Sequence, residues 1–272
     1  MFWSCVPVII ATLCLTMTVS PSKMASPQSS KADDWMNDIA SGKTRVVDLT
    51  YAISDKLVPW PTDKRWFDAE PHATFERDGY FTRSFWMLEH YGTHLDAPIH
   101  FPPGTIPVDK IPVKQLFGAG AVIDVREESD KNADYLLTVE RVEEWENQHG
   151  RIPAGSIVLL RTGWASRWPD AGKYRNQDAK GKMHFPGFSA EAVNALLQRK
   201  VNGLGCDTLS VDYGASEDFA VHHLALGAGL FNLENLADLK DLPEAGAFVI
   251  VAPIKLEGGS GGPARVFALL TE

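Results

Sequence analysis

Residues 90–101 have the sequence His90-Tyr-Gly-Thr-His94-Leu-Asp96-Ala-Pro-Ile-His100-Phe, and this stretch decides which fold and site we expect. Three of the eight histidines of the chain fall within its first eleven residues, with an aspartate between them. On a helix, steps of about 100° per residue would turn Asp96 away from His90, and the proline would obstruct the helix. On an extended segment, positions 90, 94, 96 and 100 share parity and face one side. We therefore predict an extended segment, bent at its glycine and its proline, with four ligand groups on one face.

This set of side chains is typical of a metal site. Two imidazoles and a carboxylate are the ligands of a catalytic zinc or a related divalent ion, with open positions left for water. The alternative interpretation is a β-hairpin whose histidines are exposed or satisfied within the core. Under that alternative, the shared parity and the two bends would be coincidences. The pattern therefore favours metal ligands.

The sequence on both sides of this stretch predicts more strands than helices. Apolar or β-branched runs predict strands at residues 45–53, 121–126, 156–162, 201–206, 247–254 and 264–270. A further pair, residues 72–74 and 80–88, flanks the hairpin signal Asp78-Gly79. Thr138 and Ser189 each precede apolar residues at helical spacing, and Gly150 is expected to end the first helix. The expected fold class is α/β, as a single domain with mixed β-sheets and flanking helices rather than a doubly wound parallel sheet.

The bulk composition excludes two classes of partner. The chain has 272 residues, of which 44% are apolar, so it can bury a substantial core. Its formal net charge is -9, and no basic stripe is available to neutralise phosphates. Neither nucleic acid nor an anionic membrane is therefore an expected partner.

The N-terminal sequence predicts export. Residues 1–22 contain an apolar run followed by small residues, which is typical of a signal peptide, and the run is short for a membrane span. An uncleaved anchor is the alternative. Residues 23–33 are expected to be a linker, and residues 34–272 the domain. Cleavage leaves Cys206 as the single cysteine, which we expect to be an inert core residue without a disulfide. The expected localisation is secreted or lumenal in the secretory pathway.

The pattern H-x-G-T-H-x-D-A-P-x-H at residues 90–100 resembles the signature of the cyclase-type metal-dependent hydrolases, a family that includes bacterial kynurenine formamidase and isatin hydrolase. Three further stretches are similar to family patterns: G-C-D-T-L-S-V-D at 205–212, V-H, L-G-A-G and E-N-L within 221–236, and G-P-A-R at 262–265. The resemblance covers nearly the whole mature chain. It implies an α/β domain of the swivelling β/β/α-like type, usually in a homodimer.

Carried over position by position, the resemblance implies one general acid/base, His100, and metal ligands at His90, His94, Asp96, His222 and Glu234. It also implies zinc or manganese, as one ion or two. From the residues alone, a helix over 216–226, a glycine break and a strand could bring His222 and Glu234 to one metal. The adjacent His223 leaves the choice of histidine open at that stage.

Other side chains have two interpretations each. Residues that either orient ligands or belong to strand-end turns are Asp207, Ser210 and Asp212. Aromatic residues that either line a substrate pocket or pack in the core are Trp60, Phe85 and Trp86. Arg265 is a candidate for a substrate carboxylate, but a surface ion pair is the expected role.

The resemblance implies a hydrolase that cleaves a C–N bond in a small amide, formamide or lactam on an aromatic scaffold. Metal-activated water would attack the carbonyl, and His100 would move the proton. One alternative is a secreted metal-binding or interaction module without turnover, which would have no need of His100. The other is a 2-His-1-carboxylate iron oxygenase, in which His222 and Glu234 would be superfluous.

Overall fold

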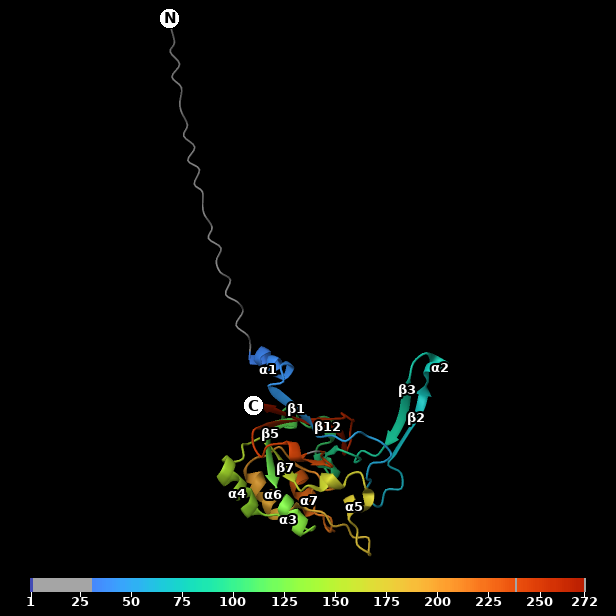
Figure 1. Ribbon diagram of the computed structural model, residues 1–272, viewed down its shortest axis with the longest axis vertical. Coiled ribbons are helices and arrows are strands. Elements are labelled where there is room, and N and C mark those ends of the chain that lie inside the picture. The colour runs from blue at the N-terminus through green and yellow to red at the C-terminus, as the bar shows by residue number, and fades with distance from the viewer. Residues whose placement is uncertain (2–30, 238, 272) are drawn as a thin grey trace.

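The computed structural model describes residues 1, 31–237 and 239–271. The described residues from 31 onward form one rounded body with a hairpin projecting from it (Figure 1). The predicted signal peptide, residues 1–22, lies outside the described residues apart from Met1. Helix α1 (Lys31–Ala40) begins inside the segment expected to be a linker. In the part of the chain that the structure describes, no helix is long and apolar enough to cross a membrane.

The body is built on one eight-stranded sheet that closes into a barrel. In spatial order its strands are β1 (Thr44–Asp48), β12 (Gly261–Thr271), β11 (Ala247–Pro253), β5 (Phe117–Asp124), β7 (Ile157–Arg161), β9 (Gly203–Cys206), β10 (Phe231–Glu234) and β4 (His94–Asp96). Closure comes from β4, which also pairs with the start of β12. Neighbours from β5 to β10 run parallel, and the other pairs are antiparallel. The predicted single α/β domain with a mixed sheet is confirmed.

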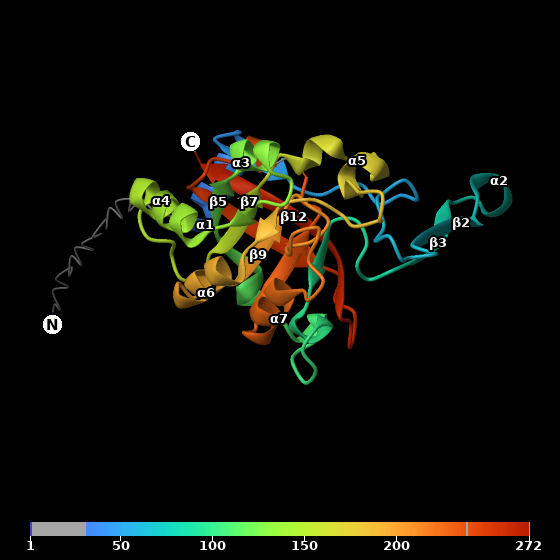
Figure 2. The ribbon, with the colours of Figure 1, turned by 90° about the horizontal axis from the view of Figure 1, so that it is seen from below.

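Short helices and two minor sheets complete the fold, and α4, α6 and α7 lie together on the outside of the barrel (Figure 2). The α-helices after α1 are α2 (Phe75–Asp78), α3 (Arg126–Lys131), α4 (Val139–His149), α5 (Ala171–Arg175), α6 (Ala190–Gln198) and α7 (Ala220–Gly227). The 3₁₀ helices are η1 (Pro98–His100), η2 (Val108–Lys110), η3 (Val113–Leu116), η4 (Trp164–Arg167) and η5 (Leu239–Asp241). The minor sheets pair β2 (Phe67–Ala73) with β3 (Thr82–Met87), and β6 (Leu136–Leu137) with β8 (Gly187–Phe188).

Strand β7 explains why some strands are continuous apolar runs. Successive side chains of a strand point to opposite faces. Ile157 and Leu159 belong to the core inside the barrel, whereas Val158 and Leu160 belong to a second core beneath the helices. Both faces of β7 are therefore buried, which explains its continuous apolar run from Ile157 to Leu160.

The two helices predicted from their caps are confirmed. The Thr138 hydroxyl accepts the Arg141 N–H at the start of α4, and the Ser189 hydroxyl accepts the Ala192 N–H at the start of α6. Such bonds satisfy backbone donors that have no partner within the helix. Gly150 follows α4 with a φ of 86°, a backbone conformation that favours glycine.

Three predicted elements differ in extent from the structure. The strand predicted over 45–53 ends at Asp48, whose carboxylate accepts the Thr50 N–H and turns the chain. The helix predicted from residue 216 begins at Ala220, because the Ser216 hydroxyl accepts the Phe219 N–H and forms a separate turn. The predicted hairpin is present, but α2 sits at its tip in place of a two-residue turn.

Candidate metal centre

The histidine-rich segment is not one extended strand. Only His94–Asp96 forms a strand, β4, and this part is extended as predicted. The chain turns before it at Gly92, which has a φ of 69°, and after it at Pro98, which opens the 3₁₀ helix η1. The two bends lie where the sequence predicted them, but they make His90 and His100 approach the site from turns rather than from a shared strand face.

Strand pairing brings Glu234 to this segment. In the antiparallel β4–β10 pair, Glu234 lies directly opposite His94. Residues opposite each other on paired strands have adjacent side chains, and the Nε2 of His94 lies 3.5 Å from Glu234 Oε2. The same nitrogen lies 3.2 Å from Asp96 Oδ1. All three residues are buried, so the carboxylates meet the imidazole away from bulk water.

His222 reaches the same point from helix α7. Its Nε2 lies 3.3 Å from Asp96 Oδ2 and 3.3 Å from Glu234 Oε1. Its Nδ1 is 2.6 Å from Asp212 Oδ2, and the same carboxylate accepts the backbone N–H of Val221 and of His222. Asp212 therefore both caps the start of α7 and orients the His222 ring, which is the ligand-orienting interpretation of this residue.

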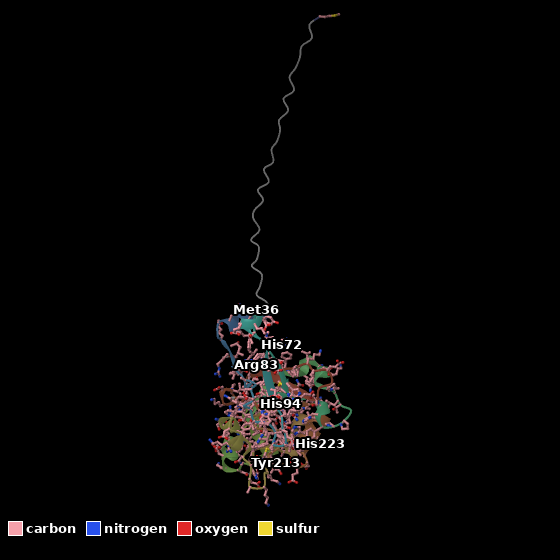
Figure 3. The ribbon with its side chains drawn as sticks, turned by 90° about the vertical axis from the view of Figure 1, so that its right-hand side faces the viewer. Met36, His72, Arg83, His94, Tyr213 and His223 are labelled. Atoms are coloured by element: carbon pink, nitrogen blue, oxygen red, sulfur yellow. The ribbon has the colours of Figure 1, made fainter. Side chains whose placement is uncertain are left out.

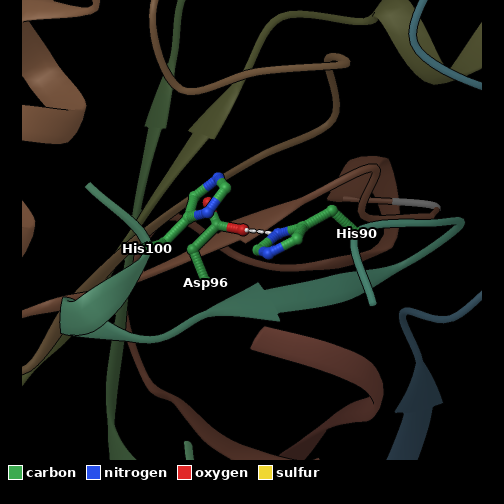
Figure 4. A group of neighbouring side chains, drawn as sticks. All are labelled: His90, Asp96 and His100. Atoms are coloured by element: carbon green, nitrogen blue, oxygen red, sulfur yellow. Dashed lines mark hydrogen bonds and ion pairs between the residues drawn. The ribbon is translucent and has the colours of Figure 1, made fainter. Parts of the chain in front are cut away.

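His90 and His100 complete the cluster from the two turns (Figure 4). His90 Nδ1 lies 2.6 Å from Asp96 Oδ1. The His100 ring stacks on the His90 ring, with 3.8 Å between ring centroids. The structure thus brings together all six side chains that the sequence nominated, with Asp96 at their centre.

The donor atoms of this cluster fit a divalent cation. His94 donates its Nδ1 proton to the Gly92 carbonyl, so Nε2 is the ring nitrogen that faces Asp96 and Glu234 and that a cation would displace a proton from. That buried Nε2 and the buried Asp96 Oδ2 have no hydrogen-bond partner among the described residues. Buried polar atoms without partners are costly, and imidazole nitrogens and carboxylate oxygens are the ligands that zinc and manganese accept.

The buried carboxylates of the cluster also favour positive charge at the imidazoles beside them. Although burial opposes it, the neighbouring Asp96 carboxylate raises the pKa of His94 to about 9. Burial likewise opposes, but Asp212 and Asp96 raise the pKa of His222 well above its usual value. The buried carboxylates thus hold protons on these imidazoles, and a bound divalent cation would supply the same compensating charge.

A cavity of about 510 Å³ opens onto the cluster, a volume typical of small-molecule sites. Its wall includes His90, His94, His100, His222 and Glu234. The apolar part of the wall is formed by Val58, Trp60, Leu88, Phe101, Leu209 and Phe219. Acidic groups come from Asp63 and Glu89, and none of the described residues in the wall is Lys or Arg.

The remaining candidates divide between the cavity and the outer surface. Trp60 lines the cavity, but Phe85 and Trp86 do not. These two lie on the projecting hairpin with 64% and 40% exposure, so the prediction of pocket or core contact is wrong for them in this chain. Figures 1 and 2 show the hairpin projecting from the body, and in Figure 3, seen from the hairpin side, the labelled hairpin residues His72 and Arg83 lie above the label of His94.

Asp207 and Arg265 have structural partners, while Ser210 lies in the cavity wall. The Asp207 carboxylate accepts the backbone N–H groups of Thr162 and Gly163 and so fixes the turn after β7. Arg265 forms the expected surface ion pair, with Asp48. Cys206 is fully buried, as predicted, and burial raises the pKa of its thiol.

Sequence reasoning missed Ser260, Glu89 and Asp63. Ser260 precedes β12, and its hydroxyl lies 2.8 Å from His90 Nε2. It reaches the site only because the start of β12 pairs with β4, a long-range contact without a local sequence signal. Glu89 adjoins His90 in the sequence, so its position alone could have nominated it.

Several known proteins are similar in sequence to this chain. A family profile described as "Putative cyclase" matches residues 47–213. An isatin hydrolase of Roseibium aggregatum is 36% identical over 85% of this chain and 94% of its own length. A kynurenine formamidase of Salinibacter ruber is 26% identical over 81% of this chain and 95% of its own.

Solved structures of similar proteins share the fold. An isatin hydrolase bound to the product analogue thioisatinate superposes with a TM-score of 0.84 at 30% identity, covering 89% of this chain and 98% of that one. Isatin hydrolase A from Ralstonia solanacearum gives a TM-score of 0.83 at 36% identity, over 90% and 99% of the two chains.

Proposed function

Because the chain belongs to the cyclase family, and its relatives named above are hydrolases, we propose that it is a metal-dependent hydrolase that cleaves a C–N bond of a small aromatic amide, formamide or lactam. The observation that carries this proposal is the convergence of imidazoles and carboxylates beside an apolar cavity. A module that only binds metal needs neither the cavity nor a further histidine in its wall.

The residues that would hold zinc or manganese are His90, His94, Asp96, His222 and Glu234. When bound, a divalent ion lowers the pKa of a coordinated water from about 15.7 toward about 7 and polarises a carbonyl oxygen. The chain's contribution is to hold these side chains in fixed positions. Asp212 does so for His222, and the Gly92 carbonyl does so for His94.

In this proposal His100 moves the proton. Burial lowers the pKa of His100 to about 4, so its imidazole is uncharged at neutral pH and one ring nitrogen has a free lone pair that can accept a proton. It lies in the cavity wall, where it can take a proton from water attacking the amide carbonyl. The same proton then passes to the leaving nitrogen as the C–N bond breaks.

The charge of the cavity wall favours a substrate without a carboxylate. Trp60, Phe101 and Phe219 supply apolar surface for an aromatic ring. Asp63 and Glu89 place acidic groups in the wall, with no Lys or Arg among its described residues to pair with an anion. A neutral lactam such as isatin therefore fits this wall better than the amino-acid end of N-formylkynurenine.

A paired assay with isatin and N-formylkynurenine, together with elemental analysis of the purified protein, tests this proposal. We expect bound zinc or manganese and a higher kcat/KM for isatin. Bound iron with oxygen-dependent turnover would support the oxygenase instead. Bound metal without turnover of either substrate, or of other aryl amides, would support the binding module.

We also propose that the protein is exported, because residues 1–22 have the pattern of a signal peptide. The mature chain should begin between Pro21 and Ser26. Intact-mass measurement of secreted protein should show this start and no disulfide, since Cys206 is the cysteine that remains. A mass that includes the first twenty residues would instead identify an uncleaved anchor.

A further inference from the structure

The second ring nitrogen of His90 is held by a pair of residues that the proposed reaction does not use. His90 Nε2 lies 2.8 Å from the hydroxyl of Ser260. The hydroxyl and the backbone N–H of Ser260 both donate to Glu89 Oε2, at 2.6 and 2.8 Å. A chain of hydrogen bonds therefore runs from Glu89 through Ser260 to the His90 ring.

The direction of these bonds fixes the proton on His90. A carboxylate oxygen only accepts, so the single hydroxyl proton of Ser260 points to Glu89. The Ser260 oxygen must then accept from His90, and the proton of a neutral His90 ring lies on Nε2. The lone pair of Nδ1 is left facing Asp96 Oδ1 at 2.6 Å, an approach that is favourable only with a positive charge nearby.

We infer that Glu89 and Ser260 are positioning residues that present the Nδ1 atom of His90 to the metal, an inference that rests on the metal site of the proposed function. His94 and His222 are held through Nδ1 and present Nε2. In His90, by contrast, Nε2 is held and Nδ1 is presented. The orientation of its ring depends on Ser260, which lies near the other end of the chain.

The backbone next to Ser260 is shaped for this contact. A Cβ atom on Gly261 would lie 2.6 Å from His90 Cε1 and 2.5 Å from the Leu95 carbonyl oxygen. Only a glycine lets the start of β12 approach the His90 ring closely enough for the serine bond. Gly261 therefore provides the space, and Ser260 provides the hydrogen bond, at the ring edge of His90 that carries Cε1 and Nε2.

The test compares Ser260→Ala and Glu89→Gln with the unsubstituted protein. The probes are Zn²⁺ affinity, measured by competition with a chelating dye, and the visible absorption spectrum of the Co²⁺-loaded protein. Both variants should bind Zn²⁺ about 10- to 100-fold more weakly, the usual effect of losing an orienting partner. Their Co²⁺ spectra should change, while thermal melting of the metal-free proteins stays the same.

Because both residues act through His90, the double variant should bind no more weakly than the weaker single variant. Glu257→Gln, an exposed acid on the turn before Ser260, is the matched control and should leave affinity and spectrum unchanged. Affinities within twofold of the unsubstituted protein in both single variants would overturn the inference. If the protein binds Zn²⁺ but hydrolyses no amide, the proposed function fails, and the affinity comparison still decides the role of Ser260.

Discussion

At the scale of single residues, His222 and His223 are chain neighbours with different surroundings. His222 is buried against Asp96 and Glu234, whereas His223 is exposed and meets only the edge of the Phe101 ring among the aromatic contacts of the described residues. We expect His222→Ala to lose most of its bound metal, because the replacement removes one nitrogen donor. His223→Ala should keep full occupancy. Elemental analysis of both purified variants measures this, and equal metal content in the two would contradict the ligand assignment.

His100 provides a second test, because the structure places it near both the metal ligands and the cavity. We expect His100→Ala to retain metal and to lose about 10²- to 10⁴-fold in turnover, the usual contribution of general acid–base catalysis. If His100 is a ligand, metal content and turnover will fall together, as in His222→Ala. Normal metal content with normal turnover would mean that another group moves the proton.

The sequence could predict which side chains meet here better than it could predict how they meet. The prediction that residues of equal parity face one side holds for His94 and Asp96, which lie two residues apart on β4. For His90 and His100 the shared parity does not explain the approach, because a turn lies between each of them and the strand. Ser260 could not be predicted at all, since its contact with His90 depends on the pairing of β12 with β4.

At the scale of elements, the start of β12 packs closely against β4, with no room for a side chain at Gly261. An alanine at Gly261 would force the Leu95 carbonyl and the His90 ring to move. We expect Gly261→Ala to lower the free energy of unfolding by about 1–3 kcal/mol, the usual cost of overpacking, and to reduce metal occupancy. Urea denaturation and elemental analysis measure the two effects.

Gly227, the last residue of α7, is the control for this substitution, because an added Cβ there meets only Pro102 Cγ at 3.9 Å. We expect Gly227→Ala to be neutral or to stabilise by about 0.5–1 kcal/mol, since alanine suits a helix better than glycine. If Gly261→Ala and Gly227→Ala change the free energy of unfolding equally, the contact between β4 and β12 is not close-packed.

Local signals explain which elements the sequence could predict. Helices α4 and α6 have capping hydroxyls and apolar faces within their own segments. The barrel closure has no such signal, because β4 is three residues long and pairs with two strands distant in the sequence. Glu234 lies opposite His94 because of that register. From the sequence, only the family resemblance indicated that these two residues belong to one site.

At the scale of the whole molecule, the hairpin of β2, α2 and β3 stands away from the body (Figure 1), and several of its aromatic residues are exposed. Phe85 and Trp86 are consecutive on β3, so their side chains point to opposite faces of the hairpin, and both are exposed. Phe75, Tyr80 and Phe81 expose further aromatic surface at its tip. An isolated two-stranded hairpin is marginally stable in water, and apolar patches of this kind mark interaction surfaces.

We therefore expect a second copy of the chain to cover the hairpin, in agreement with the homodimer that the family resemblance implies. Light scattering during size-exclusion chromatography should give twice the mass of one chain. Phe85→Glu should shift the protein toward one chain, because a charge would be buried without a partner in the interface. Val113→Glu places the same charge on an exposed apolar residue of η3, outside the hairpin, and should leave the mass unchanged. A single-chain mass for the unsubstituted protein at micromolar concentration would mean that the hairpin is free in solution, and its aromatic rings would then need another partner.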